Sequence, residues 1–227
     1  MSGESRLSSA LPNDSDGPAL DGRPGAEVTR ARMSGRERRE QLLLVGRSVF
    51  AEKGYEAASI EEIAERAKVS KPIVYEHFGG KQGLYAVVVD REVQRLLSGI
   101  MGALRDDHPR VLLEQAASAF LTYIETEPDG FRILVRDTPP MLTTSGTLAS
   151  VLGDIAERVE QILNAEFKKR GYKTKTAGLY SRALVGMVAT VGEWWLYTGK
   201  PKKADVAAHL VNLAWNGLSH LEADPTH

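Results

Sequence analysis

The chain has 227 residues, of which 42% are hydrophobic, a composition that allows a sizeable buried core. Its formal net charge of −1 excludes a protein that coats nucleic acid by overall positive charge, so any DNA binding has to come from a local basic patch. The absence of Cys excludes disulfide scaffolds, thiolate zinc sites and cysteine nucleophiles.

Residues 1–33 are rich in Gly, Pro, Ser and acidic residues without apolar periodicity, so we expect a disordered tail. The charge then changes sign, because residues 30–85 carry eleven Lys and Arg against eight Glu. Five of the arginines lie close together: Arg30, Arg32, Arg36, Arg38 and Arg39. They form either a flexible arm that reaches DNA, with Arg36 and Arg39 among the contacts, or a solvated helix face.

Three short helices joined by tight turns are expected in residues 34–80. The first ends at Gly54, and Ser59 begins a capping box that opens the second. Ser70 precedes the third helix, which ends at Gly79. Three such helices behind a basic approach are typical of a helix-turn-helix, although many small helical heads are only structural.

Residues 81–227 are expected to form a larger helical body, because apolar residues recur there at helical spacing and no period-2 alternation is sustained. The expected helices are residues 81–106, a helix that begins at Pro109, a short helix around residues 131–134, a long stripe from Leu148 to Phe167, residues 176–198 and residues 204–221. The fold class is therefore all-α, with about nine helices in a head and a body.

Three segments of the head resemble the TetR (tetracycline-repressor) family. They are residues 50–55 (FAEKGY), residues 59–64 (SIEEIA) and residues 69–78 (VSKPIVYEHF), followed by Lys81. The resemblance covers about residues 36–85 and includes the order, spacing and lengths of all these elements. It implies a dimeric repressor that binds palindromic double-stranded operator DNA and is released by a small ligand.

The resemblance also implies DNA contacts. Ser59 would cap the second helix and touch a phosphate, Tyr75 and His77 would contact the backbone, and Lys81 would grip a phosphate. The turn that enters the major groove would consist of Ser70, Lys71, Pro72 and Ile73. Glu76 departs from what a DNA-facing helix favours; it either accepts from a cytosine amine or points away.

Dimerisation is expected through the last two helices, since helix 204–221 carries apolar residues on two faces. One face would pack on its own core and the other on its twin; the alternative is a helix buried within a larger monomer. Few charged residues lie on the inner faces of the body, which favours an apolar, lipid or acyl-type effector. The candidate lining residues are Phe120, Tyr123, Ile124, Phe131, Leu134, Met141, Leu148, Met187, Val191 and Trp194.

No metal and no cofactor are expected, because the five His are scattered and no paired-carboxylate motif or phosphate-binding Gly loop is present. No apolar run approaches the ~20 residues that span a bilayer, and no signal peptide is recognisable, so we expect a cytoplasmic protein without membrane contact. The alternatives are a helical enzyme with an unrecognised site and a non-specific architectural DNA-binding protein.

Overall fold

The computed structural model describes residues 33–105, 108–136 and 148–222. These residues form nine α-helices and one short 3-10 turn, so the predicted all-α fold is confirmed. The predicted disorder of the N-terminal tail lies outside the described residues. Within them, no helix is both long enough and apolar enough to cross a membrane.

Helix α1 (Gly35–Ala57) begins with a capping box that the sequence analysis did not identify. The Ser34 hydroxyl accepts from the backbone N–H of Glu37, and the Glu37 carboxylate accepts from the Ser34 N–H in return. Gly54, the predicted end, has a positive φ of 79° that breaks the regular helix, yet one further turn continues to Ala57.

Helices α2 (Ile60–Arg66) and α3 (Lys71–Phe78) follow at the predicted positions. The Ser59 hydroxyl accepts from the N–H of Glu62 at 3.2 Å and so caps α2. The predicted capping box is only half formed, because the Glu62 carboxylate pairs with Lys53 and Arg66. Ser70 holds the same position before α3, but its side chain makes no capping hydrogen bond. Its hydroxyl is therefore not committed to the helix end.

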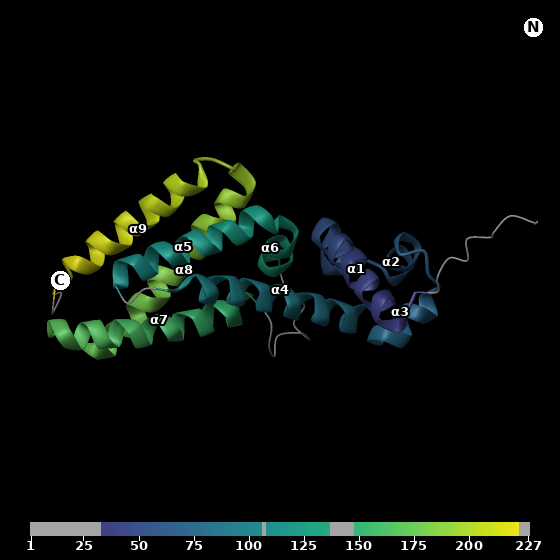
Figure 1. Ribbon diagram of the computed structural model, residues 1–227, viewed down its shortest axis with the longest axis horizontal. Coiled ribbons are helices and arrows are strands. Elements are labelled where there is room, and N and C mark those ends of the chain that lie inside the picture. Colours follow the sequence, from purple (N-terminus) through teal and green to yellow (C-terminus); the bar gives the residue numbers. More distant parts are fainter. Residues whose placement is uncertain (1–32, 106–107, 137–147, 223–227) are drawn as a thin grey trace, which may run out of the picture. The chain divides into compact units, whose positions relative to one another are not determined.

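Helix α4 (Lys81–Ala103) extends from the three-helix head into the body (Figure 1), where it packs along α5 (Pro109–Thr126). A short turn leads to α6 (Pro128–Val135), which packs against α1 and α4. Both α5 and α6 start with proline, whose missing N–H has no partner in a first helical turn anyway.

Helices α7 (Leu148–Arg170) and α8 (Ala177–Thr198) form an extensively packed pair, and α9 (Lys203–Ser219) packs along α5. The head and the body share one hydrophobic core, because α1 packs against α4 and α6. The described residues from Ser34 onward accordingly form one compact unit.

Candidate nucleic-acid interface and effector cavity

The N-terminal turn of α3 presents the groove-reading candidates to solvent. Ser70, Lys71 and Pro72 are exposed and Ile73 is half-buried, while Val74 is fully buried in the core. This alternation anchors α3 through one face and leaves the other free. The Lys71 ammonium pairs with the exposed Glu61 carboxylate of α2 at 2.5 Å, so the lysine is held at the surface of the head.

Further along α3, Tyr75 is 54% exposed and lies on the same solvent-facing side as Glu76. His77 is half-buried and its ring lies against Phe78, with 6.1 Å between the ring centroids. Ser59 is half-buried and Arg36 is exposed in the first turn of α1. Among these predicted DNA contacts, Tyr75 and Arg36 are open to a phosphate, whereas His77 and Ser59 are partly covered.

Arg39 and Lys81 have intramolecular partners that the sequence did not reveal. Arg39 Nη1 donates to the carbonyl oxygen of His77 at 2.7 Å, and the guanidinium lies 4.4 Å from the centre of the Phe78 ring. Lys81 Nζ donates to the carbonyl oxygens of Tyr55, Glu56 and Ala58 at 2.9, 3.3 and 3.0 Å. Both side chains therefore brace the head, and a phosphate would have to compete with these contacts.

Two small apolar cavities, each partly open to solvent, lie between helices of the body. The first, of about 80 Å³, is lined by Ile100, Leu113, Ala116, Ala117, Phe120, Leu152, Ile155, Val159, Leu184, Val185, Val188 and Ala189. The second, of about 110 Å³, is lined by Leu104, Pro109, Leu112, Leu113, Ala116, Val159, Ile162, Leu163, Leu184, Trp215 and Leu218. Since Leu113, Ala116, Val159 and Leu184 border both, the two cavities adjoin.

A larger hollow of about 730 Å³ is an open groove between α4 and α5. Eight of its twelve lining residues are polar or charged: Arg95, Glu114, Gln115, Ser118, Thr122, Tyr123, Thr126 and Glu127. For an apolar ligand, enclosure by aliphatic side chains matters more than size, because the removal of apolar surface from water drives its binding. The two smaller cavities therefore fit the predicted apolar effector better than the groove does.

Two sequence models of known families match the chain. One is described as "Bacterial regulatory proteins, tetR family" and matches residues 42–88; the other, "Tetracyclin repressor-like, C-terminal domain", matches residues 100–226. The chain belongs to the TetR family. It is a DNA-binding transcriptional regulator, and the resemblance of its head to that family is confirmed.

Individual TetR-family relatives agree with this assignment. The transcriptional activator FasR of Mycolicibacterium smegmatis is 34% identical over 189 residues, which are 82% of this chain and 84% of that protein. A TetR-like regulator from Rhodococcus sp. RHA1 superimposes with a TM-score of 0.70 at 26% identity, over 83% of this chain and 99% of that one. The fatty acid degradation regulator FadR from Bacillus halodurans has a TM-score of 0.65 over 84% and 100%, and at 19% identity it shows the fold alone. All three are named as regulators.

The predicted lining residues of this TetR-family body have different environments. Phe120 lines the first cavity, whereas Tyr123 borders the polar groove. Three others are buried in the core without lining either cavity: Ile124, Phe131 and Leu134.

Met187 and Val191, on α8, are half-buried and pack against the core, outside the lining of both cavities. Trp194 is 51% exposed and lines neither cavity, because it lies on the solvent side of α8. Leu148 is the first residue of α7, and Met141 lies outside the described residues. Trp194 therefore does not contribute to either cavity wall.

Aromatic and Met side chains were prominent among the predicted lining residues, but the cavity walls are mostly aliphatic. Leu113, Leu152, Ile155, Val159 and Leu184 belong to apolar stripes that helical periodicity makes visible. Periodicity identifies the inward face of a helix and says nothing of where two inward faces fail to fill the space between them. That information comes only from the packed helices.

Proposed function

We propose that this TetR-family regulator binds a palindromic operator as a homodimer and that an apolar, acyl-type ligand in the body lowers its operator affinity. The observation that carries the ligand class is the wall of the two adjoining cavities, which contains no charged side chain among the described residues and, apart from the indole of Trp215, no polar one. A ligand with a charged or strongly polar centre would lose its hydration there without gaining a partner. An alkyl chain gains roughly 0.8 kcal/mol for each buried methylene.

Support for the DNA-binding role of α3 comes from its exposed first turn. Lys71 is the candidate for base contact, since a lysine can donate to the acceptor edge of guanine. Ser70, Pro72 and Ile73 would shape the contact with the groove, and Tyr75 would reach the backbone. We assign phosphate contacts to Ser59, His77 and Arg36, and bracing roles within the head to Arg39 and Lys81.

Support for the homodimer comes from α8 and α9. Large apolar side chains stay at least half exposed there: Leu179, Trp194, Tyr197 and Leu213. Large apolar side chains that a helix leaves exposed to solvent are typical of an interface. A twin that covers them would place two α3 helices on one DNA face, one or more turns of about 34–36 Å apart.

The sign of the transcriptional effect depends on the operator. The resemblance implied a repressor, whereas the 34% identical relative is named an activator. A regulator that overlaps the polymerase site represses, and one bound upstream of it can recruit polymerase. The proposal therefore concerns the release of operator DNA, which relieves repression in the first case and ends activation in the second.

The test starts with the selection of bound operators from random DNA, followed by titration of saturated fatty acids of about 4 to about 16 carbons against the protein–operator complex. We expect affinity to rise with chain length, and operator affinity to fall by a factor that corresponds to ~1–3 kcal/mol of coupling. Affinity that is independent of chain length, or release by a charged polar effector alone, would contradict the proposal.

A matched pair of variants locates the site. Ala116 borders both cavities, so Ala116→Met fills the passage between them and should abolish the response to long chains. Ser118 lies on the same helix and is exposed, so Ser118→Met adds a similar side chain outside the cavities. An equal loss of response in both variants would place the ligand elsewhere.

A further inference from the structure

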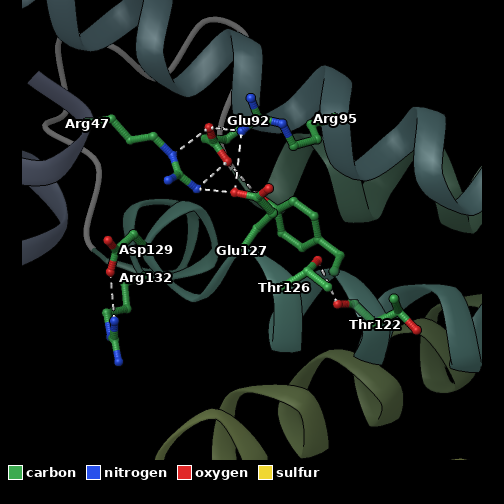
Figure 2. A network of polar contacts seen from close by, with 9 residues as sticks. Arg47, Glu92, Arg95, Thr122, Thr126, Glu127, Asp129 and Arg132 are labelled. Carbon is green, nitrogen blue, oxygen red and sulfur yellow. Dashed lines mark hydrogen bonds and ion pairs between the residues drawn. The ribbon is translucent and has the colours of Figure 1, made fainter. Parts of the chain in front are cut away.

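Charged side chains converge where the head meets the body (Figure 2). Glu92, in α4, is only 1% exposed. Arg47 of α1 donates to both of its carboxylate oxygens, from Nε at 3.0 Å and from Nη2 at 3.4 Å. The same Nη2 donates to Glu127, at the junction of α5 and α6, at 2.6 Å. One arginine of the head is thus bonded to two carboxylates of the body.

Two further side chains complete this Glu92 cluster. Arg95 Nη1 donates to Glu92 Oε1 at 2.5 Å, and the Tyr123 hydroxyl of α5 donates to Glu92 Oε2 at 3.0 Å. The two arginines balance the charges of Glu92 and Glu127. Burial and the neighbouring Glu92 carboxylate raise the pKa of Tyr123 well above its ordinary value of 10.0, so the phenol remains a donor.

The first turn of α6 closes the cluster. A Cβ atom on Gly130 would lie 1.9 Å from Glu92 Oε2 and 2.7 Å from the Tyr123 hydroxyl, so only glycine permits this approach. The cluster therefore touches four helices, α1, α4, α5 and α6. The close approach of Gly130 to Glu92 and Tyr123 leaves little room for these side chains to adopt another arrangement.

A second ion pair joins the same two helices, and it provides a comparison. The two terminal guanidinium nitrogens of Arg91 in α4 donate to the two carboxylate oxygens of Glu40 in α1, at 2.6 and 2.8 Å, but both side chains are more than 40% exposed. Water and salt screen such a pair, which contributes little. Removing a partner from the buried Glu92 leaves uncompensated charge in the interior, which is far more costly.

The Glu92 cluster shares its helices with the effector cavity. Phe120, one turn before Tyr123 on α5, lines the first cavity, and its ring packs edge-on against Phe131 of α6, with 5.6 Å between the ring centroids. Ile100 of α4 lines the same cavity two turns after Glu92. A ligand that separates α4 from α5 must therefore move groups of the cluster relative to one another.

The cluster is also linked to the recognition helix. Arg47 lies two turns after Arg39 on α1, and Arg39 donates to the last turn of α3 through the carbonyl oxygen of His77. α1 thus carries one arginine that is bonded to the body and one that is bonded to the DNA-reading helix. Any change in the angle between α1 and α4 displaces α3.

We propose that Glu92 is a positioning residue, which holds Arg47 so that the head is fixed at the angle that suits the operator. The inference rests on the proposed function. It adds that breaking the contact between Glu92 and Arg47, which we call the clamp, lowers operator affinity as the effector does. The clamp confers no affinity for DNA itself, because Glu92 is buried and remote from α3. It selects one orientation of the two heads of the proposed dimer.

The first experiment reports on the angle between the head and the body, through a distance between α2 and α7 measured without DNA or ligand. Since the chain has no Cys, the variants Glu65→Cys in α2 and Glu157→Cys in α7, both at exposed positions, allow two spin labels on one chain. Labelled protein is diluted with unlabelled protein, and the distance distribution is measured by double electron–electron resonance. We expect a narrow distribution for the wild type and for Glu40→Gln, and a broader or shifted one for Glu92→Gln.

The second experiment measures the affinity for operators whose half-sites are separated by inserted base pairs. Wild type and Glu40→Gln should prefer one spacing, whereas Glu92→Gln should lose about tenfold in affinity for the preferred site and discriminate less between spacings. Binding to random DNA should remain unchanged. A merely structural role would lower the melting temperature without altering the preference for spacing.

Arg47→Lys serves as a second variant if Glu92→Gln does not fold, because a single ammonium cannot bridge both carboxylates as the guanidinium does. Its distance distribution should also broaden. A folded Glu92→Gln or Arg47→Lys protein with the wild-type distance distribution and spacing preference overturns the inference, as does an equal effect of Glu40→Gln. Neither experiment uses an acyl compound, so a wrong prediction of the ligand class would not affect their outcome.

Discussion

Arg39 Nη1 and the carbonyl oxygen of His77 are joined by a hydrogen bond of 2.7 Å between α1 and the end of the recognition helix. The same guanidinium lies over the Phe78 ring at 4.4 Å. A side chain predicted to reach DNA thus holds α3 in place. Removal of the Arg39 side chain should therefore disturb the packing of the head more than it weakens the attraction to DNA.

Arg39→Ala should lower the free energy of unfolding by about 1–2 kcal/mol, because a charge-assisted hydrogen bond and a cation–π contact disappear together. Denaturant titration measures this change. Arg38→Ala is the matched control, since Arg38 Nη1 donates to Gln41 within the same helix α1. Equal destabilisation by both variants would contradict the bracing role.

Lys81→Ala distinguishes a brace from a phosphate contact. The resemblance to the family predicts a salt dependence of DNA binding that flattens by about one unit, whereas the three carbonyl contacts predict an unchanged slope and a head less stable by about 1–2 kcal/mol. We expect the second result. Titrations of operator at several salt concentrations, together with thermal melts, decide between the two.

Lys71→Ala should relax the sequence preference at the base pairs that α3 reads, at a cost of about 1–3 kcal/mol for the preferred base. Selection of bound sequences from random DNA, repeated with the variant, measures this change. Lys169→Ala removes a similar surface lysine from α7, where it pairs with Glu166. If Lys71→Ala keeps the wild-type preference, the base contact has to come from elsewhere on α3.

Leu213→Lys should convert the proposed homodimer into a monomer, because it places a charge among the exposed apolar side chains that a twin would cover. Leu213 is 64% exposed in the single chain, and Leu44 of α1 is 68% exposed. Leu44→Lys is therefore a control for the loss of an exposed leucine. Sedimentation at micromolar concentration should give a monomer for the first variant and a dimer for the second.

Tyr123 predicts a particular alkaline instability. Its pKa is raised in the folded protein, so the folded state keeps the phenol proton when the unfolded chain loses it. The contribution to stability is complete below pH 10.0 and is lost as the pH rises above that value. The unfolding free energy of Tyr123→Phe should fall less steeply there than that of the wild type, whereas Tyr197→Phe, at an exposed position, should follow the wild type.

Local sequence determined most of the fold of this protein. Ser59, Pro109 and Gly199 each mark the start or end of a helix where the sequence predicts it, because caps, prolines and left-handed glycines act within a single turn. Apolar spacing indicated the inward faces of the remaining helices. The motif of the head, in which residues lie close together along the chain, revealed the family for the same reason.

The tertiary structure decided what depends on distant segments. Arg47 and Glu92 are 45 residues apart in the chain, and Glu92 resembles any other helical glutamate in the sequence until α1 and α6 close over it. Lys81 likewise gained its three carbonyl partners only through the packing of α1 against α4. The cavity follows the same logic, because a space between helices depends on how several faces pack together, and no single stretch of sequence contains that information.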